Sequence, residues 1–370
     1  MNDKIKLKDA CKILNGFAFK SGKYVDSGIR IIRIANVQKG YVEDERPAFY
    51  PNSEESSIRD YMLEEDDLLL SLTGNVGRVA LLDKRWLPAA LNQRVACLRI
   101  KDDRIIKDYL YFALLSDKFE NDCTESSKGI AQKNMSTEWL KDYEIPLPSR
   151  QKQREIISSL KQLSMIIKNK TEQIQQLDDL IKARFVEMFG DVYKSSKYSR
   201  KKWSDIVDIK NGKDYKKVAV KDGGFPVYGT GGEMARASEY LCPENTIIVG
   251  RKGTINNPLL VREKFWNVDT AFGVIPGKEL HHLYFFWFCR MFDFSRLNKQ
   301  AVLPSTTKAD LLNIEMQVPP IEIQNQFAIF IAQVDKSKFV LSNELTMCDF
   351  YIRLIHDRVM HGRINLRVTQ

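Results

Sequence analysis

The sequence predicts an α+β fold made of two modules in tandem repeat, each followed by a long helix, with the two helices paired as a coiled coil. One observation is an apolar heptad pattern that runs from Ile156 to Met188 and recurs in the same register from Phe327 to Val359, with a constant interval between equivalent positions. A second is that landmarks before each pattern recur in the same order. A period of about 3.5 residues held over several heptads is typical of coiled coils rather than of single surface helices.

Each module is expected to begin with a short amphipathic stretch that ends in Asn-Gly. An apolar strand then runs into a glycine turn, and an aromatic helix follows further along the chain. Short strands with Gly and Asn turns beside one or two helices are typical of an α+β module. In order, the three features lie at Leu7–Gly16, Leu68–Gly77 and Tyr109–Phe119 in the first half, and at Trp203–Gly212, Ile247–Asn256 and Leu283–Phe294 in the second.

An extended segment bounded by proline precedes each heptad pattern. Pro148 and Gln153 of the first half recur as Pro319 and Gln324 of the second, at the same interval that relates the two heptad patterns. Proline disfavours helix at the residue before it but is tolerated in the first helical turn. Each long helix is therefore expected to begin close to its proline.

The polar, basic stretch KSSKYSRKK has no apolar period, which favours a linker between the two halves. Three basic residues, Lys170, Arg184 and Lys338, interrupt the apolar heptads, where they can fix the register or lie at the edge of the seam. We expect a first module at residues 1–143, a first long-helix segment at 144–190, a linker at 191–202, a second module at 203–314, and a second long-helix segment with the C-terminal tail at 315–370.

Composition favours a polyanionic partner and a reducing compartment. Lys and Arg number 57 against 48 Asp and Glu, a net charge of +9, which suits nucleic acid without identifying it. Six scattered cysteines without a Cys-x-x-Cys pair are typical of reduced, intracellular proteins. The N-terminus lacks an apolar signal region, and the densest apolar run, Leu283–Cys289, is too short to cross a membrane. We therefore expect a cytoplasmic protein without membrane contact.

No complete catalytic, metal or cofactor site is expected in this chain. The glycine loops at Gly229–Gly232 and Gly250–Thr254 match neither phosphate-binding pattern, and the four histidines have no ligand set beside them. The adenine-methyltransferase tetrapeptide, Asn or Asp followed by Pro-Pro and an aromatic residue, is absent. The acidic run Glu64–Asp67 is interpreted as a solvated turn before a strand.

Side chains suited to reading DNA gather at equivalent turns of both modules. Arg and Lys pair with guanine, and Asn and Gln pair with adenine. A single polar loop residue is usually only solvated, so the prediction depends on the clusters. The candidates are Arg33, Asn36, Gln38, Lys39, Ser71, Thr73, Asn75, Arg78, Asn92, Gln93, Arg94, Lys128, Lys133 and Asn134 in the first module, and Lys213, Tyr215, Lys216, Tyr228, Thr230, Arg251, Lys252, Thr254, Asn256, Thr306 and Lys308 in the second, with Gln132, Lys299, Ser305 and Thr307 beside them.

Over essentially its whole length the chain resembles the specificity subunit of type I restriction-modification systems. The strings that carry the resemblance include LLLSLTGNVGRVALL, ALNQRV and YEIPLPSRQKQREI in the first half, and WSDIVDIKNGK, FPVYGTGG, IIVGRKGTI and IEMQVPPIEIQNQF in the second. The resemblance implies a non-catalytic DNA reader with two target recognition domains, one for each half of a split, asymmetric DNA sequence. It implies that the two long helices pair antiparallel as a spacer between them.

The resemblance also implies partners. Two modification subunits would bind S-adenosylmethionine and methylate adenine, and restriction subunits would use ATP and magnesium to translocate and cleave double-stranded DNA.

From Ile156 to Met188 the first helix would be ~50 Å long, the length of ~15 base pairs. Two alternatives stay open: the recognition subunit of a related bifunctional methyltransferase-nuclease, and a two-headed coiled-coil adaptor that binds only proteins.

Overall fold

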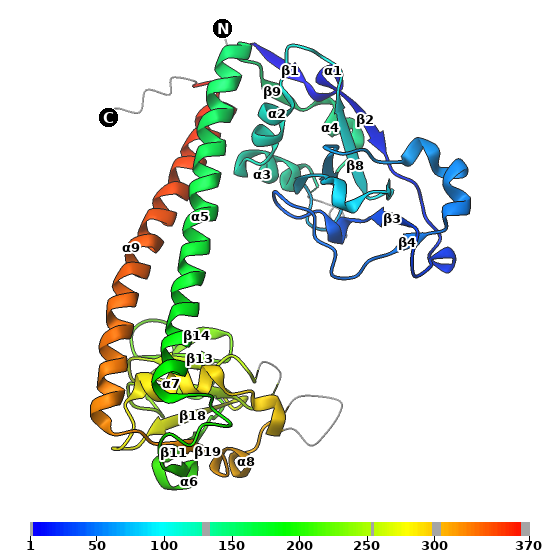
Figure 1. Cartoon of the computed structure of the whole chain (residues 1–370). Helices are drawn as coiled ribbons and strands as arrows, with labels where there is room; N and C mark the ends of the chain where they lie inside the picture. The colour runs from blue at the N-terminus through cyan, green and yellow to red at the C-terminus, as the bar shows by residue number, and fades with distance from the viewer. Residues whose placement is uncertain (1–2, 128–133, 253–254, 298–304, 364–370) are drawn as a thin grey trace. The chain divides into compact units, whose positions relative to one another are not determined.

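The computed structural model describes residues 3–127, 134–252, 255–297 and 305–363 of the chain (Figure 1). The chain divides into two units: unit 1 is Met1–Asn169 with Glu344–Gln370, and unit 2 is Lys170–Asn343. Both units include parts of the long helices α5 (Arg150–Phe189) and α9 (Ile321–Met360). Each unit therefore contains one module, the first half of one long helix and the second half of the other.

Unit 1 contains a four-stranded antiparallel sheet in the order β2-β8-β5-β6, a three-stranded sheet in the order β4-β3-β7, and the antiparallel pair β1-β9. Its elements are β1 (Lys4–Lys6), α1 (Leu7–Ala10), β2 (Cys11–Asn15), η1 (Ser21–Lys23), β3 (Ile29–Ile32), η2 (Ile34–Asn36), β4 (Phe49–Tyr50), η3 (Asn52–Tyr61), β5 (Leu68–Ser71), β6 (Val79–Leu81), η4 (Lys84–Trp86), β7 (Ala89–Leu91), β8 (Val95–Ile100), α2 (Lys107–Leu114), α3 (Asp117–Ser126), α4 (Thr137–Asp142) and β9 (Glu144–Pro146).

Unit 2 contains the corresponding four-stranded sheet β11-β18-β15-β16, a four-stranded sheet β12-β14-β13-β17, and the antiparallel pair β10-β19. Its elements are β10 (Arg200–Lys202), α6 (Trp203–Ile206), β11 (Val207–Asn211), β12 (Ala219–Val220), β13 (Phe225–Gly229), β14 (Gly232–Ala237), β15 (Thr246–Gly250), β16 (Leu259–Val261), β17 (Trp266–Asn267), β18 (Ala271–Pro276), α7 (His282–Met291), η5 (Phe294–Leu297), α8 (Lys308–Leu312) and β19 (Glu315–Gln317).

The predicted tandem α+β architecture is confirmed, because the main sheet and the short strand pair recur in the same order in both units. Each amphipathic stretch before an Asn-Gly is one helical turn followed by a strand. The glycine of each Asn-Gly is required by close backbone packing. A Cβ at Gly16 would overlap the carbonyl oxygen of Asn92, and a Cβ at Gly212 would overlap that of Val268.

The aromatic helix expected at Tyr109–Phe119 is two helices. Helix α2 ends at Leu114 and α3 begins at Asp117. Ser116 lies between them as the N-cap of α3, and its hydroxyl accepts a hydrogen bond from the backbone N–H of Phe119 (3.2 Å). A serine that satisfies a backbone N–H in this way starts a new helix rather than continuing the old one.

The long helices pack together antiparallel within each unit, as expected. In unit 1, Ile156 near the start of α5 shares a buried core with Val359 near the end of α9. In unit 2, Phe185 near the end of α5 shares a core with Phe327 near the start of α9, and their rings are 5.6 Å apart. Figure 1 shows α9, coloured orange to red, beside α5, coloured green. The apolar heptads thus form the contact between the helices and also extend the core of each module.

A buried glutamine ties the start of α5 to the module of unit 1. Gln153 is fully buried. Its Oε1 accepts a hydrogen bond from the backbone N–H of Ile106 (2.8 Å), and its Nε2 donates to the carbonyl oxygens of Arg104 and Pro148 (both 2.9 Å). The side chain thereby joins the first turn of the helix to the loop before α2.

Gln324 makes the same three bonds in unit 2, and it too is fully buried. Its Oε1 accepts from the backbone N–H of His281 (2.8 Å), and its Nε2 donates to the carbonyl oxygens of Glu279 (2.9 Å) and Pro319 (2.7 Å). The repeated proline and glutamine therefore have the same roles in both units: the helix begins two residues after the proline, and the glutamine bonds the first turn of the helix to the module.

Lys338 and Arg184, which interrupt the heptads, form ion pairs. Lys338 on α9 donates to Asp178 on α5 (2.7 Å), and this contact lies within unit 2. Arg184 pairs with Glu187 one turn along α5 (2.8 Å), and its guanidinium lies 5.9 Å from the ring centre of Phe330. Lys170 is half-buried. The Lys338–Asp178 pair joins the two helices, which supports the interpretation that a polar seam residue fixes their register.

Replacing Lys338 with methionine should lower the free energy of unfolding by about 1 kcal/mol, because Asp178 would keep its charge at a half-buried position without its partner. The double variant Lys338→Met, Asp178→Leu should regain that loss, since two apolar side chains can pack in the seam. Urea unfolding of the unchanged protein, the two single variants and the double variant measures both effects. A double variant less stable than Lys338→Met would show that the pair does not act as a unit.

Two segments differ from the sequence expectation. Asp67 of the acidic run is not solvated: its side chain is 5% exposed and accepts two hydrogen bonds from the Arg99 guanidinium (2.8 and 2.7 Å). The pairing with an arginine on the neighbouring strand β8 offsets the free-energy cost of burying this carboxylate.

The stretch 191–202, expected as a linker, ends in strand β10, which pairs with β19 as β1 pairs with β9.

Candidate nucleic-acid interface

In unit 1, three segments distant in sequence meet beside the end of strand β5. The backbone N–H of Leu72 donates to the carbonyl oxygen of Arg94 (3.0 Å), and the N–H of Met135 donates to the carbonyl oxygen of Leu72 (2.9 Å). Thr73 and Asn134 form an isolated antiparallel bridge. The turn after β5, the turn before β8 and the segment before α4 are thus held side by side by backbone bonds.

Unit 2 repeats this junction. The backbone N–H of Arg251 donates to the carbonyl oxygen of Thr270 (2.9 Å), and the N–H of Thr306 donates to the carbonyl oxygen of Arg251 (3.0 Å). Lys252 and Ser305 form the corresponding antiparallel bridge. The turn after β15, the turn before β18 and the segment before α8 therefore meet as their counterparts do in unit 1.

The junction of unit 1 is hollowed into a groove of about 570 Å³. We call it the recognition groove. Four predicted DNA-reading residues line it, and three of them, Gln93, Arg94 and Asn134, are exposed. Among the described residues, the structure gives the side chains of Gln93 and Arg94 no hydrogen-bond partner. The residues that line the groove are Leu72, Thr73, Gln93, Arg94, Asn134, Met135, Ser136 and Thr137.

Ser136 and Thr137 were not among the predicted residues. The hydroxyl of Ser136 caps α4 by accepting from the backbone N–H of Glu138 (3.2 Å). The repeat contained a signal for this position, because Ser136 is the first-half equivalent of Thr307, which the sequence placed among the polar residues of the second module. Thr307 caps α8 in the same way, with its Oγ1 accepting from the backbone N–H of Asp310 (3.1 Å).

At the junction of unit 2 the predicted residues divide into free and engaged side chains. Arg251 and Lys252 are exposed, and the Arg251 guanidinium lies 5.9 Å from the ring centre of Phe272. Thr306 is 1% exposed, and its Oγ1 has no hydrogen-bond partner among the described residues. Lys308 instead donates to the carbonyl oxygen of Ile209 (2.7 Å) and holds α8 against β11.

Asn256 also has a structural role, since its side chain donates to Asp293 (2.8 Å) and accepts from the backbone N–H of Phe294 (2.7 Å). Lys213 and Lys216 are exposed near strand β12. The remaining residues are half-buried: Tyr228 contacts the ring of Phe265 (5.7 Å), Tyr215 packs against the cluster around Val227, and Thr230 follows β13. Lys128, Lys133 and Thr254 lie outside the described residues.

In unit 1, several predicted DNA-reading side chains bond within the turn after β5. Arg78 donates to the Oε1 of Gln38, and its backbone N–H donates to the hydroxyl of Ser71 (3.0 Å). The Ser71 hydroxyl in turn donates to the carbonyl oxygen of Asn75, whose side-chain amide also lies 3.2 Å from the Arg78 guanidinium. This network shapes the turn, so these four residues support the groove rather than present free side chains to it.

The loop 33–46 is held by further predicted residues. Asn36 is buried and donates to the carbonyl oxygen of Glu43 (2.9 Å), and Arg33 donates to the carbonyl oxygen of Arg46. Lys39 forms ion pairs with two carboxylates on helix α3, Asp117 and Glu120 (both 2.7 Å). Asn92 accepts from the backbone N–H of Arg94 (3.3 Å). The structure thus brings Thr73, Gln93, Arg94 and Asn134 together, and it gives other candidates internal partners.

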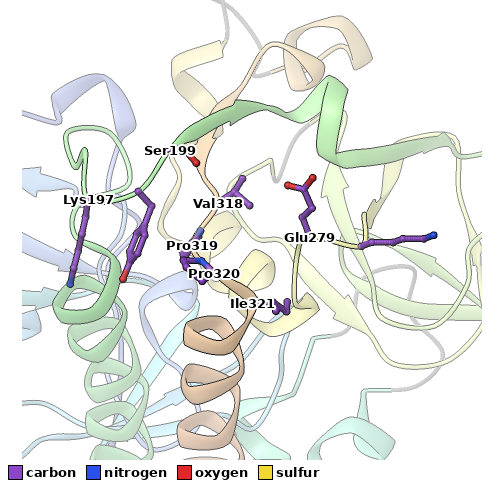
Figure 2. A pocket seen from close by; sticks show the side chains of 9 residues that line it. Lys197, Ser199, Glu279, Val318, Pro319, Pro320 and Ile321 are labelled. Atoms are coloured by element: carbon purple, nitrogen blue, oxygen red, sulfur yellow. The ribbon is translucent and has the colours of Figure 1, made fainter.

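Unit 2 has another hollow, of about 630 Å³, at the start of α9 (Figure 2). Val318, Pro319 and Pro320 line it, and in this view they lie between Lys197 and Glu279. None of the predicted DNA-reading residues lines this hollow. It belongs to the segment that leads into the helix, not to the junction of turns.

Several buried titratable side chains are neutral near pH 7. Burial raises the pKa of the thiols of Cys11 and Cys242 to about 12, so both are neutral near pH 7. Burial and the neighbouring His281 lower the pKa of His282 to about 4, so it is neutral as well. Within the described parts of the chain no three His, Cys, Asp or Glu side chains lie close enough to hold a metal ion, and no helix is long and apolar enough to cross a membrane.

Comparison with known proteins relates both halves of the chain to one family. The family described as "Type I restriction modification DNA specificity domain" matches residues 2–178 and 195–346. The type I restriction enzyme MjaVIII specificity subunit of Methanocaldococcus jannaschii is 27% identical over 178 residues, which are 47% of this chain and 42% of that protein. The EcoAI specificity subunit of Escherichia coli is 31% identical over 163 residues, which are 43% of this chain and 27% of that protein. Each of these two matches thus spans less than half of the relative.

A solved structure matches over nearly the whole length. The S subunit of a type I restriction-modification system from M. genitalium has a TM-score of 0.53 at 15% identity, and the match covers 97% of this chain and 96% of that one. At this identity the likeness concerns the fold alone. It relates the complete order of module, long helix, module and long helix to a known architecture.

Proposed function

Because the chain belongs to the family of type I restriction modification DNA specificity domains, we propose that it is a non-catalytic subunit that recognises a bipartite, asymmetric DNA sequence for a type I restriction-modification complex. The observation that carries this proposal is the junction of three turns that recurs with the same backbone bonds in both modules. The side chains at equivalent positions differ: Leu72 and Thr73 of unit 1 stand where unit 2 has Arg251 and Lys252, and Gln93 and Arg94 stand where unit 2 has Asp269 and Thr270. Like scaffolds with unlike side chains favour two half-sites of different sequence.

The chemistry of the recognition groove suits the edges of base pairs. Arg94 has the planar donor pair that binds guanine O6 and N7, and Gln93 and Asn134 can bind adenine through N6 and N7. These three side chains are exposed, while Thr73 is half-buried between them and the strand. In unit 2, the exposed cations Arg251 and Lys252 suit guanine or phosphate.

The long helices carry apolar side chains that the chain itself leaves exposed. Exposed apolar residues surrounded by charged ones are typical of protein interaction surfaces. We propose that two modification subunits bind here, that restriction subunits join them, and that S-adenosylmethionine, ATP and magnesium are bound by those partners. The exposed residues are Met165, Ile166, Met347, Phe350 and Tyr351 in unit 1, and Leu180, Val186, Ile321, Ile329, Phe339 and Val340 in unit 2.

Neither alternative accounts for the observations as well. An adaptor that binds only proteins gives no reason for exposed arginine side chains at the equivalent junctions of both modules. The recognition subunit of a bifunctional methyltransferase-nuclease would share these junctions, but the family match is to type I specificity domains.

Affinity for duplex DNA should fall steeply as salt rises. A protein that neutralises several phosphates loses about 10³-fold or more in affinity between roughly 50 and 200 mM salt, because bound counterions are released. Fluorescence anisotropy of a labelled duplex with the purified chain and modification subunit measures the slope. An affinity that does not change with salt would favour the protein-only adaptor.

Methylation mapping of the same complex identifies the target. Genomic DNA from cells that express the chain with its modification subunit should contain methylated adenines in one split, asymmetric sequence. Methylation at a symmetric or undivided sequence would contradict the proposal of two different readers.

A further inference from the structure

Each module has an exposed asparagine at the end of the first strand of its main sheet. Asn15 is the last residue of β2 and pairs with Ala96, the second residue of β8. Asn211 is the last residue of β11 and pairs with Phe272, the second residue of β18. The two residues therefore occupy the same position in both sheets, beside the turn that leads into β8 or β18.

Asn15 lies next to the recognition groove of unit 1. Its Oδ1 accepts from the hydroxyl of Thr137, which lines the groove (3.5 Å). Two residues after Asn15, the carbonyl oxygen of Phe17 accepts from the backbone N–H of Gln93, another lining residue (2.9 Å). The end of β2 thus contacts two sides of the groove, although Asn15 is not itself a lining residue.

Two lysines flank the equivalent residue of unit 2. Lys308, which corresponds to Thr137 in the repeat, donates to the carbonyl oxygen of Ile209, two residues before Asn211 (2.7 Å). Lys213, two residues after Asn211, is exposed. Asn211 therefore lies in a segment with positive charge on both sides of it, a setting that favours an anion.

The fold does not require asparagine at either position. Asparagine is favoured at turns where the backbone is left-handed or where its side chain bonds to the neighbouring backbone. Asn15 and Asn211 instead end strands, and neither is among the described non-glycine residues with positive φ. Within the described ranges, the side chain of Asn15 bonds only to Thr137, and that of Asn211 has no bonded partner. The close packing at each Asn-Gly depends on the glycine.

The asparagine is identical in both modules, whereas the side chains at the turns of the junction differ. Side chains that differ suit the edges of bases, because the two half-sites differ in sequence. A side chain that is the same in both modules suits the part of DNA that is the same in every sequence, the sugar-phosphate backbone. Asparagine is one of the neutral residues that donate to phosphate oxygens, and such contacts set the position of a protein on the duplex.

We propose that Asn15 and Asn211 each donate from Nδ2 to a phosphate of the DNA backbone and thereby position their modules on the two half-sites. This inference rests on the proposed function and adds to it a contact that does not read sequence. In unit 1 the bond with Thr137 uses Oδ1, so the Nδ2 donors of Asn15 remain for the phosphate.

Replacing Asn15 with lysine tests the contact by placing a positive charge at the proposed phosphate. In complex with the modification subunit, this variant should bind duplex DNA with a salt slope steeper by about 0.9, because one more counterion is released. Between roughly 50 and 200 mM salt, its affinity should therefore fall about 3.5-fold more than that of the unaltered complex. Fluorescence anisotropy measures these affinities, and the increment should be the same for a target duplex and for an unrelated one.

Asp9→Asn is the matched control, because it also raises the net charge by one. Asp9 is exposed and precedes the opposite end of β2, a five-residue strand about 17 Å long. This control should leave the salt slope unchanged. Asn211→Lys should give in unit 2 the result expected of Asn15→Lys, and it replaces that variant if Asn15→Lys does not fold.

Asn15→Ala distinguishes a phosphate contact from a base contact. It should weaken binding to both duplexes about fivefold, through the loss of one hydrogen bond, and leave the methylated sequence unchanged. The inference is overturned if Asn15→Ala binds as tightly as the unaltered complex, if it relaxes the sequence preference of one half-site, or if the lysine variants have the salt slope of Asp9→Asn. Failure of the proposed function would look different, since the unaltered complex itself would then show no salt-dependent affinity for DNA.

Discussion

Replacing Gln93 and Arg94 together with alanine should weaken binding of the methyltransferase complex to its target about 100-fold, because each base contact contributes about 1–3 kcal/mol. The loss should be confined to one half-site, since both residues lie in the recognition groove of unit 1. Methylation mapping would then show relaxed sequence preference in that half and an unchanged other half. Both side chains are exposed and lack partners among the described residues, so the fold should be unaffected.

Lys101→Ala is the matched control for this variant. Lys101 is also exposed and basic, but it follows the opposite end of strand β8, a six-residue strand about 20 Å long. It should alter affinity at most by the small, sequence-independent amount of one phosphate contact. If Lys101→Ala relaxed the sequence preference as strongly as the double variant did, the assignment of the recognition groove would be wrong.

In unit 2, the double variant Arg251→Ala with Lys252→Ala should relax the other half-site and leave the first one unchanged. These residues occupy the equivalent junction, and the two modules are separate units. A change in the same half-site for both variants would contradict the assignment of one half-site to each module.

Replacing Gln324 with alanine should lower the free energy of unfolding by about 3 kcal/mol or more. The side chain is fully buried, and its loss would leave one backbone N–H, of His281, and two carbonyl oxygens without their partner. Each buried polar group left unsatisfied costs about 1–3 kcal/mol. Urea unfolding followed by far-UV circular dichroism measures the effect.

Gln326→Ala is the control, because Gln326 is exposed two residues further along the same helix and should change stability by less than about 0.5 kcal/mol. Gln153→Ala should behave as Gln324→Ala does, since Gln153 makes the same three bonds in unit 1. If both glutamine variants were as stable as the control, the attachment of the helices would have to come from the apolar seam alone.

Internal repetition made much of the candidate site predictable. The junction residues Thr73, Gln93, Arg94 and Asn134 follow strands at turns that recur in the second half, and loop positions of this kind can be located from local sequence patterns. What such patterns cannot show is whether a polar side chain is already engaged. Lys39 was a candidate on the same grounds as Arg94, yet it pairs with Asp117, 78 residues away. Asp67 was expected in water, yet it is buried against Arg99.

The sequence alone determined the tandem repeat, the two long helices and the positions where each helix begins. These features depend on interactions between residues close together in the chain: the heptad period, the proline before each helix and the Asn-Gly turns. Only the tertiary structure decided which polar residues line the recognition groove, and that Lys338 pairs with Asp178 across 160 residues. Such contacts depend on how distant segments are brought together, and a single sequence contains no local signal for the partner of a given charge.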